Sequence, residues 1–180
     1  RGGELDRVTE RMLRAFGEYV CRHWQQPDDG IWEPRSGKRH NTHSRVLCWA
    51  ALNDLLSLHE EGHLRQAPSA LFKKNRAMIR EEVEQHAWNP QLQSYTAQLD
   101  GEDLDASTLL LPWYGFEDAG TGRMRATHAR VREALGTGNG LLYRYLPEQS
   151  PDGLAGREGA FLLCSFWLVD NLADQCRLPE

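Results

Sequence analysis

The chain has 180 residues, a length that suits one domain with a sizeable core and is short for two. Its 21 basic and 26 acidic residues give a formal net charge of -5 at pH 7 and a pI of about 5.8. The length predicts one domain over residues 1–180. The net charge and the absence of any block of five like charges predict no nucleic-acid partner. The chain has no apolar run near the roughly 18 residues of a membrane span, which predicts no membrane contact.

Helical periodicity dominates the first half of the chain. Apolar residues three and four positions apart predict an amphipathic helix over residues 4–24, which ends before a turn cluster between Pro27 and Gly30. Residues 44–59 are apolar almost all round, which predicts a helix buried on several sides. A third helix is predicted over residues 70–87.

The second half continues the same pattern. Helices are predicted over residues 105–111 with Asp105 or Ser107 as the cap, over residues 123–135 with Gly136 closing it, and over residues 159–176. Residues 94–98 and 141–145 alternate weakly, so each predicts either a small hairpin or an extended loop. Three successive pairs of one amphipathic and one buried helix favour an all-α fold of αα-hairpins, with functional residues on the loops at one end.

Four cysteines are scattered along the chain without a C-x-x-C pair. They are Cys21, Cys48, Cys164 and Cys176. Small buried thiols of this kind are typical of a reducing compartment, so we expect free thiols and a cytoplasmic location.

Carboxylates recur in the loops that lead into the buried helices. Glu33 lies between Trp32 and Pro34, an apolar setting with few hydrogen-bond donors, which would raise the pKa of its carboxyl and suit a general acid. Glu158 stands near the start of the last helix, where the helix dipole favours the ionised form that a general base needs, although such a position is also an ordinary capping preference. Two carboxylates with different pKa values are what hydrolysis of a glycosidic bond requires.

Aromatic and charged residues near these carboxylates suit a sugar ligand. Indole rings stack on the C–H faces of sugar rings, and hydroxyl groups take Arg, Asp or Asn partners. The candidates are Trp32, Trp49 and Trp113, together with Arg35, Arg39 and Asp103, although Trp49 also suits the core. The spacing of His40 and His43 fits a metal, but no third ligand is convincing and no phosphate-binding loop is present, so we expect neither a metal nor a cofactor.

Three segments resemble glycoside hydrolase family 15, the family of glucoamylases and of certain bacterial and archaeal trehalases. They are PDDGIWEPRSGKRHNTHSRVLCWAAL at residues 27–52, GEDLDASTLLLP at residues 101–112 and GREGAFLLCSFWLVDNLA at residues 156–173. Their order and spacing are similar to the family's, and they extend over most of the chain. The resemblance implies an α/α toroid of six helical hairpins, of which this chain would supply about half, from the C-terminal part of the catalytic domain.

The resemblance also implies site residues. Glu33 matches the general acid, and Glu158, in a Glu-Gly-Ala-Phe motif, matches the general base of the trehalase-like branch. Glu148, in a Pro-Glu-Gln context, is a rival for the base. Trp32, Arg35, Arg39 and His40 match positions around the innermost glucose.

The leading functional prediction is therefore an inverting α-glucosidase of the glucoamylase type, which releases β-glucose from maltose or α-glucan ends. An α,α-trehalase of the same family is the alternative, and a non-catalytic carbohydrate-binding or scaffold remnant is a third. The expected partner is an α-glucoside or oligosaccharide. Half a toroid would expose inner-helix surface, so self-association or pairing with the missing N-terminal half is also expected.

Overall fold

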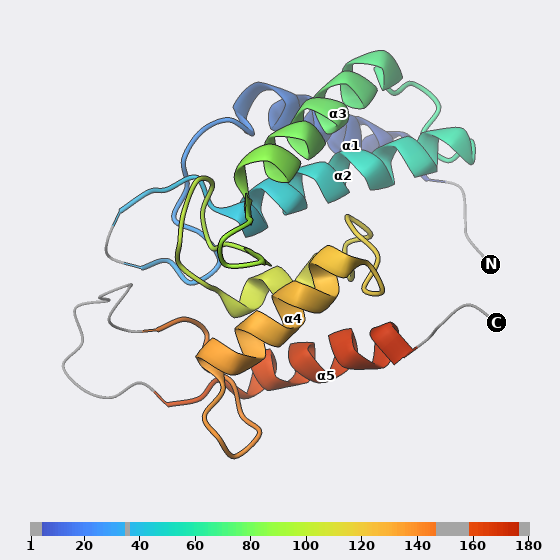
Figure 1. The fold of residues 1–180 in the computed structure, drawn as a ribbon. Helices are drawn as coiled ribbons and strands as arrows, with labels where there is room; N and C mark the ends of the chain where they lie inside the picture. The colour runs from blue at the N-terminus through green and yellow to red at the C-terminus, as the bar shows by residue number, and fades with distance from the viewer. Residues whose placement is uncertain (1–4, 35–36, 147–158, 177–180) are drawn as a thin grey trace.

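The structure is a computed structural model that describes residues 5–34, 37–146 and 159–176. The α-helices are α1 (Arg7–His23), α2 (Thr42–Glu60), α3 (Ser69–His86), α4 (Gly122–Leu135) and α5 (Leu162–Cys176); a 3₁₀ helix, η1 (Ala106–Leu110), and two short strands, β1 (Trp88–Asn89) and β2 (Ser94–Tyr95), complete the elements. Figure 1 shows α1, α2 and α3 gathered on one side and α4 and α5 on the other. The predicted all-α fold class is confirmed.

All six predicted helices differ from the observed bounds at one or both ends, and two of them differ in an informative way. The segment predicted as a helix over residues 105–111 forms only the five-residue 3₁₀ helix η1. The last helix begins at Leu162 and not at residue 159, and the backbone N–H of Phe161, just before it, donates to the Leu142 carbonyl at 2.8 Å. Helical periodicity therefore located the elements but not their exact ends.

The two extended segments differ in their outcome. Residues Ser94–Tyr95 pair antiparallel with Trp88–Asn89, so the first segment forms a small hairpin. The second segment contributes only an isolated bridge between Gly136 and Leu142.

The core consists of two clusters, one on each side of the molecule. The first, between α1, α2 and α3, includes Val46, Leu52, Leu56, Phe72, Ile79 and Val83. The second, between η1, α4 and α5, includes Leu104, Leu109, Val131, Leu135, Leu142 and Cys164. Cys21, Cys48 and Cys164 carry free thiols.

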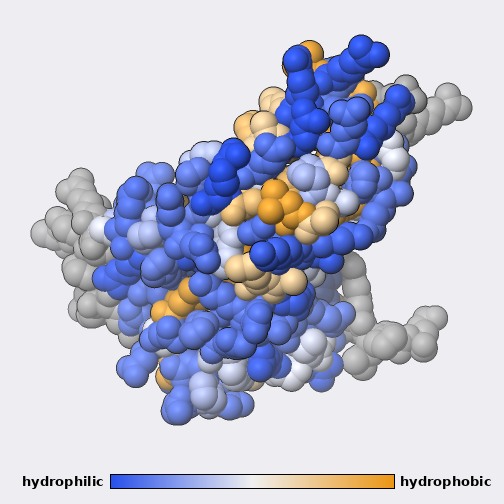
Figure 2. Space-filling view, turned by 90° about the horizontal axis from the view of Figure 1, so that it is seen from above, coloured by the Kyte–Doolittle hydropathy of each residue, from blue (hydrophilic) through white to orange (hydrophobic). Residues whose placement is uncertain are grey.

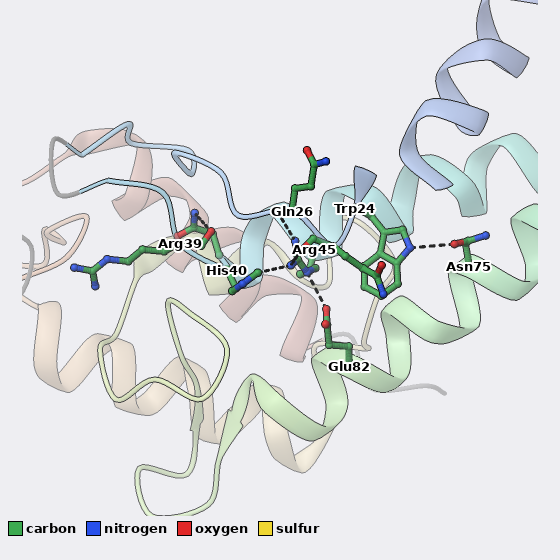
Figure 3. Close-up of polar contacts among 9 residues, drawn as sticks. Trp24, Gln26, Arg39, His40, Arg45, Asn75 and Glu82 are labelled. Atoms are coloured by element: carbon green, nitrogen blue, oxygen red, sulfur yellow. Dashed lines mark hydrogen bonds and ion pairs between the residues drawn. The ribbon is translucent and has the colours of Figure 1, made fainter. Parts of the chain in front are cut away.

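A buried network joins the first three helices (Figure 3). Arg45 of α2 is 1 % exposed, and its guanidinium donates to Glu82 of α3 at 2.8 Å and to the carbonyl oxygens of Gln26 and Gln25 at 3.3 and 3.2 Å. The indole N–H of Trp24 donates to Asn75 at 3.0 Å in the same region. These bonds fix the chain that leaves α1 against α2 and α3.

Large apolar side chains remain exposed on α1 and α5. On α1 they are Val8, Met12, Phe16 and Tyr19, and on α5 they include Leu162, Phe166, Val169 and Leu172. Figure 2, a view from above, shows apolar residues among the hydrophilic ones on the side of α1 and α3.

None of the helices in the described part of the chain is long and apolar enough to span a membrane.

Candidate active site

Asp28 anchors the loop that carries Trp32 and Glu33. Backbone N–H···O bonds of 3.0 and 2.9 Å join Asp28 and Arg39, so the loop leaves and returns at neighbouring points. The Asp28 carboxylate also accepts from the hydroxyl of Ser44, in the first turn of α2, at 2.6 Å. The loop is therefore tied to the amino-terminal end of α2.

A small cavity lies where this loop meets η1 and the start of α2. Its walls include Trp32, His43, Asp103, Asp105 and Tyr145. The cavity measures about 40 Å³, whereas pockets for small ligands measure roughly 300–1,000 Å³. A hexose does not fit inside it, so the described residues supply only part of the wall that a sugar site needs.

Trp32 is the side chain around which this region is built. Its indole Nε1 donates to Oδ2 of Asp105 at 2.8 Å. Its ring meets Trp167 and Phe161 with centroids 5.8 and 5.7 Å apart, and the guanidinium of Arg144 lies 5.4 Å from its centroid. Trp32 thus connects the loop before α2 with η1, the segment before α5, and α5 itself.

Glu33 has an unusual backbone conformation. Its φ is +48°, in the left-handed region that residues other than glycine rarely adopt. Its neighbours Trp32 and Pro34 both line the cavity, whereas Glu33 is exposed and is absent from the lining. The described residues therefore do not form the apolar enclosure that the sequence predicted for this carboxyl.

His43 is a buried histidine in the wall of the cavity. It is 5 % exposed, its Nε2 lies 3.3 Å from the Tyr114 hydroxyl, and its Nδ1 has no hydrogen-bond partner among the described residues. Burial lowers the pKa of His43 to about 4, and the negative charge of Asp28 opposes that shift. The imidazole is therefore neutral near pH 7.

Asp105 is the buried carboxylate of the site. Burial raises the pKa of its carboxyl, while hydrogen bonds from Ser107 and Trp32 and the positive charge of Arg144 oppose that rise. Its Oδ1 accepts from the Ser107 backbone N–H at 2.7 Å, which caps η1 as the sequence predicted. The cavity is thus lined by a neutral imidazole, an indole and a hydrogen-bonded carboxyl group.

The sequence of the chain matches the model of a known protein family. The model of Glycosyl hydrolases family 15 matches residues 2–177, nearly the whole chain. The chain belongs to glycosyl hydrolases family 15.

Curated relatives of this chain include several trehalases. The chain is 38% identical over 167 residues to the trehalase of Mycolicibacterium smegmatis, matching 91% of this chain and 24% of that protein. It is 32% identical over 173 residues to the trehalase of Thermoplasma acidophilum, matching 96% of this chain and 28% of that protein. The chain therefore spans about a quarter of the length of these relatives.

Solved structures agree with the family's fold. A glycosidase variant in complex with glucose matches with a TM-score of 0.72 at 21% identity, over 88% of this chain and 40% of that chain. The wild-type glycosidase matches with the same TM-score, identity and coverage. Family 15 glycosidases are α/α toroids, and this chain forms a part of one, in keeping with the prediction of about half.

The structure brings together only some of the site residues predicted from the family 15 resemblance. Trp32 and Asp103 line the cavity, and Glu33 lies beside it. The guanidinium of Arg39 donates to the side-chain oxygen of Gln98 at 3.0 Å, and neither Arg39 nor Gln98 lines the cavity.

Two further candidates lie among other contacts. His40 has its Nδ1 2.7 Å from the Arg45 guanidinium, in the network between α2 and α3 (Figure 3). Trp49 is 5 % exposed and packs on Phe116, with Arg80 4.9 Å from its ring centroid. The structure gives Trp49 the position of a core residue, the alternative that the sequence left open.

Three predicted residues lie outside the described residues. They are Arg35, Glu148 and Glu158. The spacing between the two candidate catalytic carboxylates therefore stays a prediction.

Sequence reasoning missed three residues of the site. His43 entered only as half of a metal-like spacing, Asp105 only as a helix cap, and Tyr145 not at all. Asp105 and Trp32 are 73 positions apart in the sequence, and no local pattern predicts a hydrogen bond over that separation.

Among the described residues, no group of three or more His, Cys, Asp or Glu side chains could hold a metal ion.

Proposed function

We propose that this chain is the part of an inverting α,α-trehalase that carries its catalytic carboxylates. The observation behind this proposal is the identity of 31–38% to four curated trehalases. These relatives favour the trehalase alternative over maltose or α-glucan ends, which the sequence had put first.

In the proposed reaction, Glu33 protonates the glycosidic oxygen as the bond to the anomeric carbon breaks. Glu158 takes a proton from the water that attacks the same carbon on the opposite face. One glucose leaves as the β-anomer, and the other keeps its α-configuration because its own C1–O bond is not broken.

Packing between the two segments supports this pairing of carboxylates. Trp32, the neighbour of Glu33, meets Phe161 edge-on at 5.7 Å, and Phe161 follows Glu158 by three positions. Inverting enzymes need about 6.5–9.5 Å between the two carboxyl groups.

The cavity residues suggest how a glucose unit is bound. We assign Trp32 to stacking on the sugar ring and Asp103 to its hydroxyl groups, since both belong to the part of the site's wall that the described residues supply. Arg35, Arg39 and His40 remain proposed partners of the innermost glucose unit. Trp49 has no such role in the proposal, because its ring is enclosed in the core.

Proton NMR of glucose release tests the proposal directly. The chain is mixed with trehalose and, separately, with maltose, and the anomeric signals are followed before mutarotation. Equal early amounts of α- and β-glucose from trehalose are expected, whereas a retaining enzyme would give α-glucose alone. Faster release from maltose than from trehalose would overturn the substrate assignment.

Variants identify the carboxylates. Glu33→Gln and Glu158→Gln should each abolish release, and Glu148→Gln should retain it if Glu158 is the base. Loss in Glu148→Gln with activity retained in Glu158→Gln would reverse that assignment. A folded chain that releases no glucose from either sugar would favour the non-catalytic alternative.

A further inference from the structure

Asp105 has two carboxylate oxygens with two separate partners. Oδ1 accepts from the Ser107 backbone N–H at 2.7 Å, and Oδ2 accepts from the Trp32 indole at 2.8 Å. The residue is 8 % exposed. Burying a carboxylate is costly unless its oxygens are hydrogen-bonded, so a buried Asp at this position requires a reason.

Capping of η1 does not supply that reason alone. One oxygen suffices for a cap, and Ser, Thr or Asn provide one without a charge. Only a carboxylate offers a second acceptor in the same side chain, and here that acceptor binds Trp32. The second carboxylate oxygen at this position therefore serves the indole, and the charge of the acid interacts with Arg144, in addition to the helix cap.

The hydrogen bond fixes the residue next to Glu33. Trp32 is also held by the rings of Phe161 and Trp167, which limits where the indole can lie. Glu33 follows directly, in a strained left-handed conformation that persists only where the surrounding structure imposes it. Releasing the indole would remove one of the constraints on that backbone and change the direction of the Glu33 side chain.

We propose that Asp105 is a positioning residue for the general acid: its hydrogen bond to Trp32 holds Glu33 in the conformation that delivers a proton to the glycosidic oxygen. This inference rests on the proposed role of Glu33. It assigns to Asp105 no contact with the substrate.

Two substrates separate positioning of the acid from general damage. Trehalose needs a proton on its departing oxygen, whereas α-glucosyl fluoride releases fluoride ion, which departs without protonation. Both need the attacking water and the base. A residue that acts through the acid therefore affects kcat on trehalose far more than kcat on the fluoride.

The test compares wild type with Asp105→Asn on both substrates. Asn keeps one acceptor oxygen for the cap and loses the second. A displaced acid lowers the rate by about 10- to 100-fold, so we expect kcat on trehalose to fall by that factor and kcat on α-glucosyl fluoride to fall by less than about threefold. Glu33→Gln should show the same selectivity, and Glu158→Gln should lower both rates.

Trp32→Phe removes the same hydrogen bond from the donor side and keeps an aromatic ring, so it replaces Asp105→Asn if that variant does not fold. The double variant should be no slower than the slower single variant, because both single variants delete the same interaction.

Asp118→Asn is the matched control. The Asp118 carboxylate also accepts from the backbone N–H two positions further on, that of Gly120 at 2.6 Å, but Asp118 is exposed. It should leave both rates unchanged.

The outcomes are distinct. Equal losses on the two substrates, or no loss on either, in an active protein would overturn the positioning role and leave the proposed function intact. A wild-type chain that cleaves neither substrate would overturn the proposed function and this inference with it.

Discussion

The Nε of Arg45 lies 2.8 Å from the Glu82 carboxylate, and this ion pair joins α2 to α3 in the interior of the protein. The Arg45 side chain is 2% exposed and that of Glu82 28%. Two backbone carbonyl groups and His40 accept three further hydrogen bonds from the guanidinium. A planar, five-donor group is required to reach all these partners from one position.

Arg45→Lys should therefore destabilise the fold although the charge is kept. An ammonium group at this position leaves acceptors unpaired, and we expect a loss of about 2–3 kcal/mol in the free energy of unfolding. Urea denaturation monitored by circular dichroism measures it. Arg130→Lys, in an exposed pair with Glu133, should change stability by less than about 0.5 kcal/mol. Similar losses in both variants would show that the network adds nothing specific.

His43 should make the protein less stable as the pH falls. Its pKa is about 4 in the folded state and about 6.5 when unfolded. Between these values the unfolded chain binds a proton that the folded chain does not, so stability is complete above about pH 6.5 and falls as the pH approaches 4. The shift corresponds to about 3 kcal/mol.

The comparison with His43→Gln isolates that contribution. Wild type should lose about 3 kcal/mol more than the variant between pH 7 and pH 4 in urea denaturation. The raised pKa of Asp105 acts in the opposite direction, since its contribution falls as the pH rises, but it is common to both proteins. Parallel pH profiles for the two proteins would mean that His43 is not the group responsible.

Gly17 permits close packing of α1 on its neighbours. A Cβ at this position would lie 2.5 Å from Phe72 and 2.7 Å from Leu55. Gly17→Ala should lower stability by about 1–3 kcal/mol, because the core must shift to accept the methyl group. Gly122→Ala, at the start of α4 with open space around it, should be neutral or stabilising by about 0.5 kcal/mol. A neutral Gly17→Ala in thermal unfolding would contradict such close packing of α1.

Periodicity predicted the helices well because burial of one face acts locally, over three or four residues. The buried character of α2 was predicted from its all-round apolar composition, and Val46, Leu52 and Leu56 lie in the core. Asp105 was one of the two caps predicted, with Ser107, and capping involves residues only two positions apart. Each of these features depends on neighbours in the sequence.

The candidate site was predicted only in part because its contacts are long-range. The resemblance drew attention to Trp32 and Glu33, but the pairing of Trp32 with Asp105 and the burial of His43 depend on how distant segments meet. Composition around Glu33 suggested an enclosed carboxyl, whereas its side chain is exposed. An apolar neighbour in the sequence does not cover a side chain when the backbone directs that side chain away from it.

Exposed apolar side chains on α1 should make the chain self-associate. Val8, Met12 and Phe16 recur every four residues, and they are 65%, 47% and 59% exposed. A contiguous apolar stripe of this kind marks a contact surface, whereas isolated apolar residues do not. In sedimentation velocity the weight-average mass should rise above 20.6 kDa as concentration increases. Met12→Ser with Phe16→Ser should reduce that rise, whereas Leu71→Ser on α3, 42% exposed, should not. A monomer at all concentrations would show that the α1 stripe does not drive association of this chain.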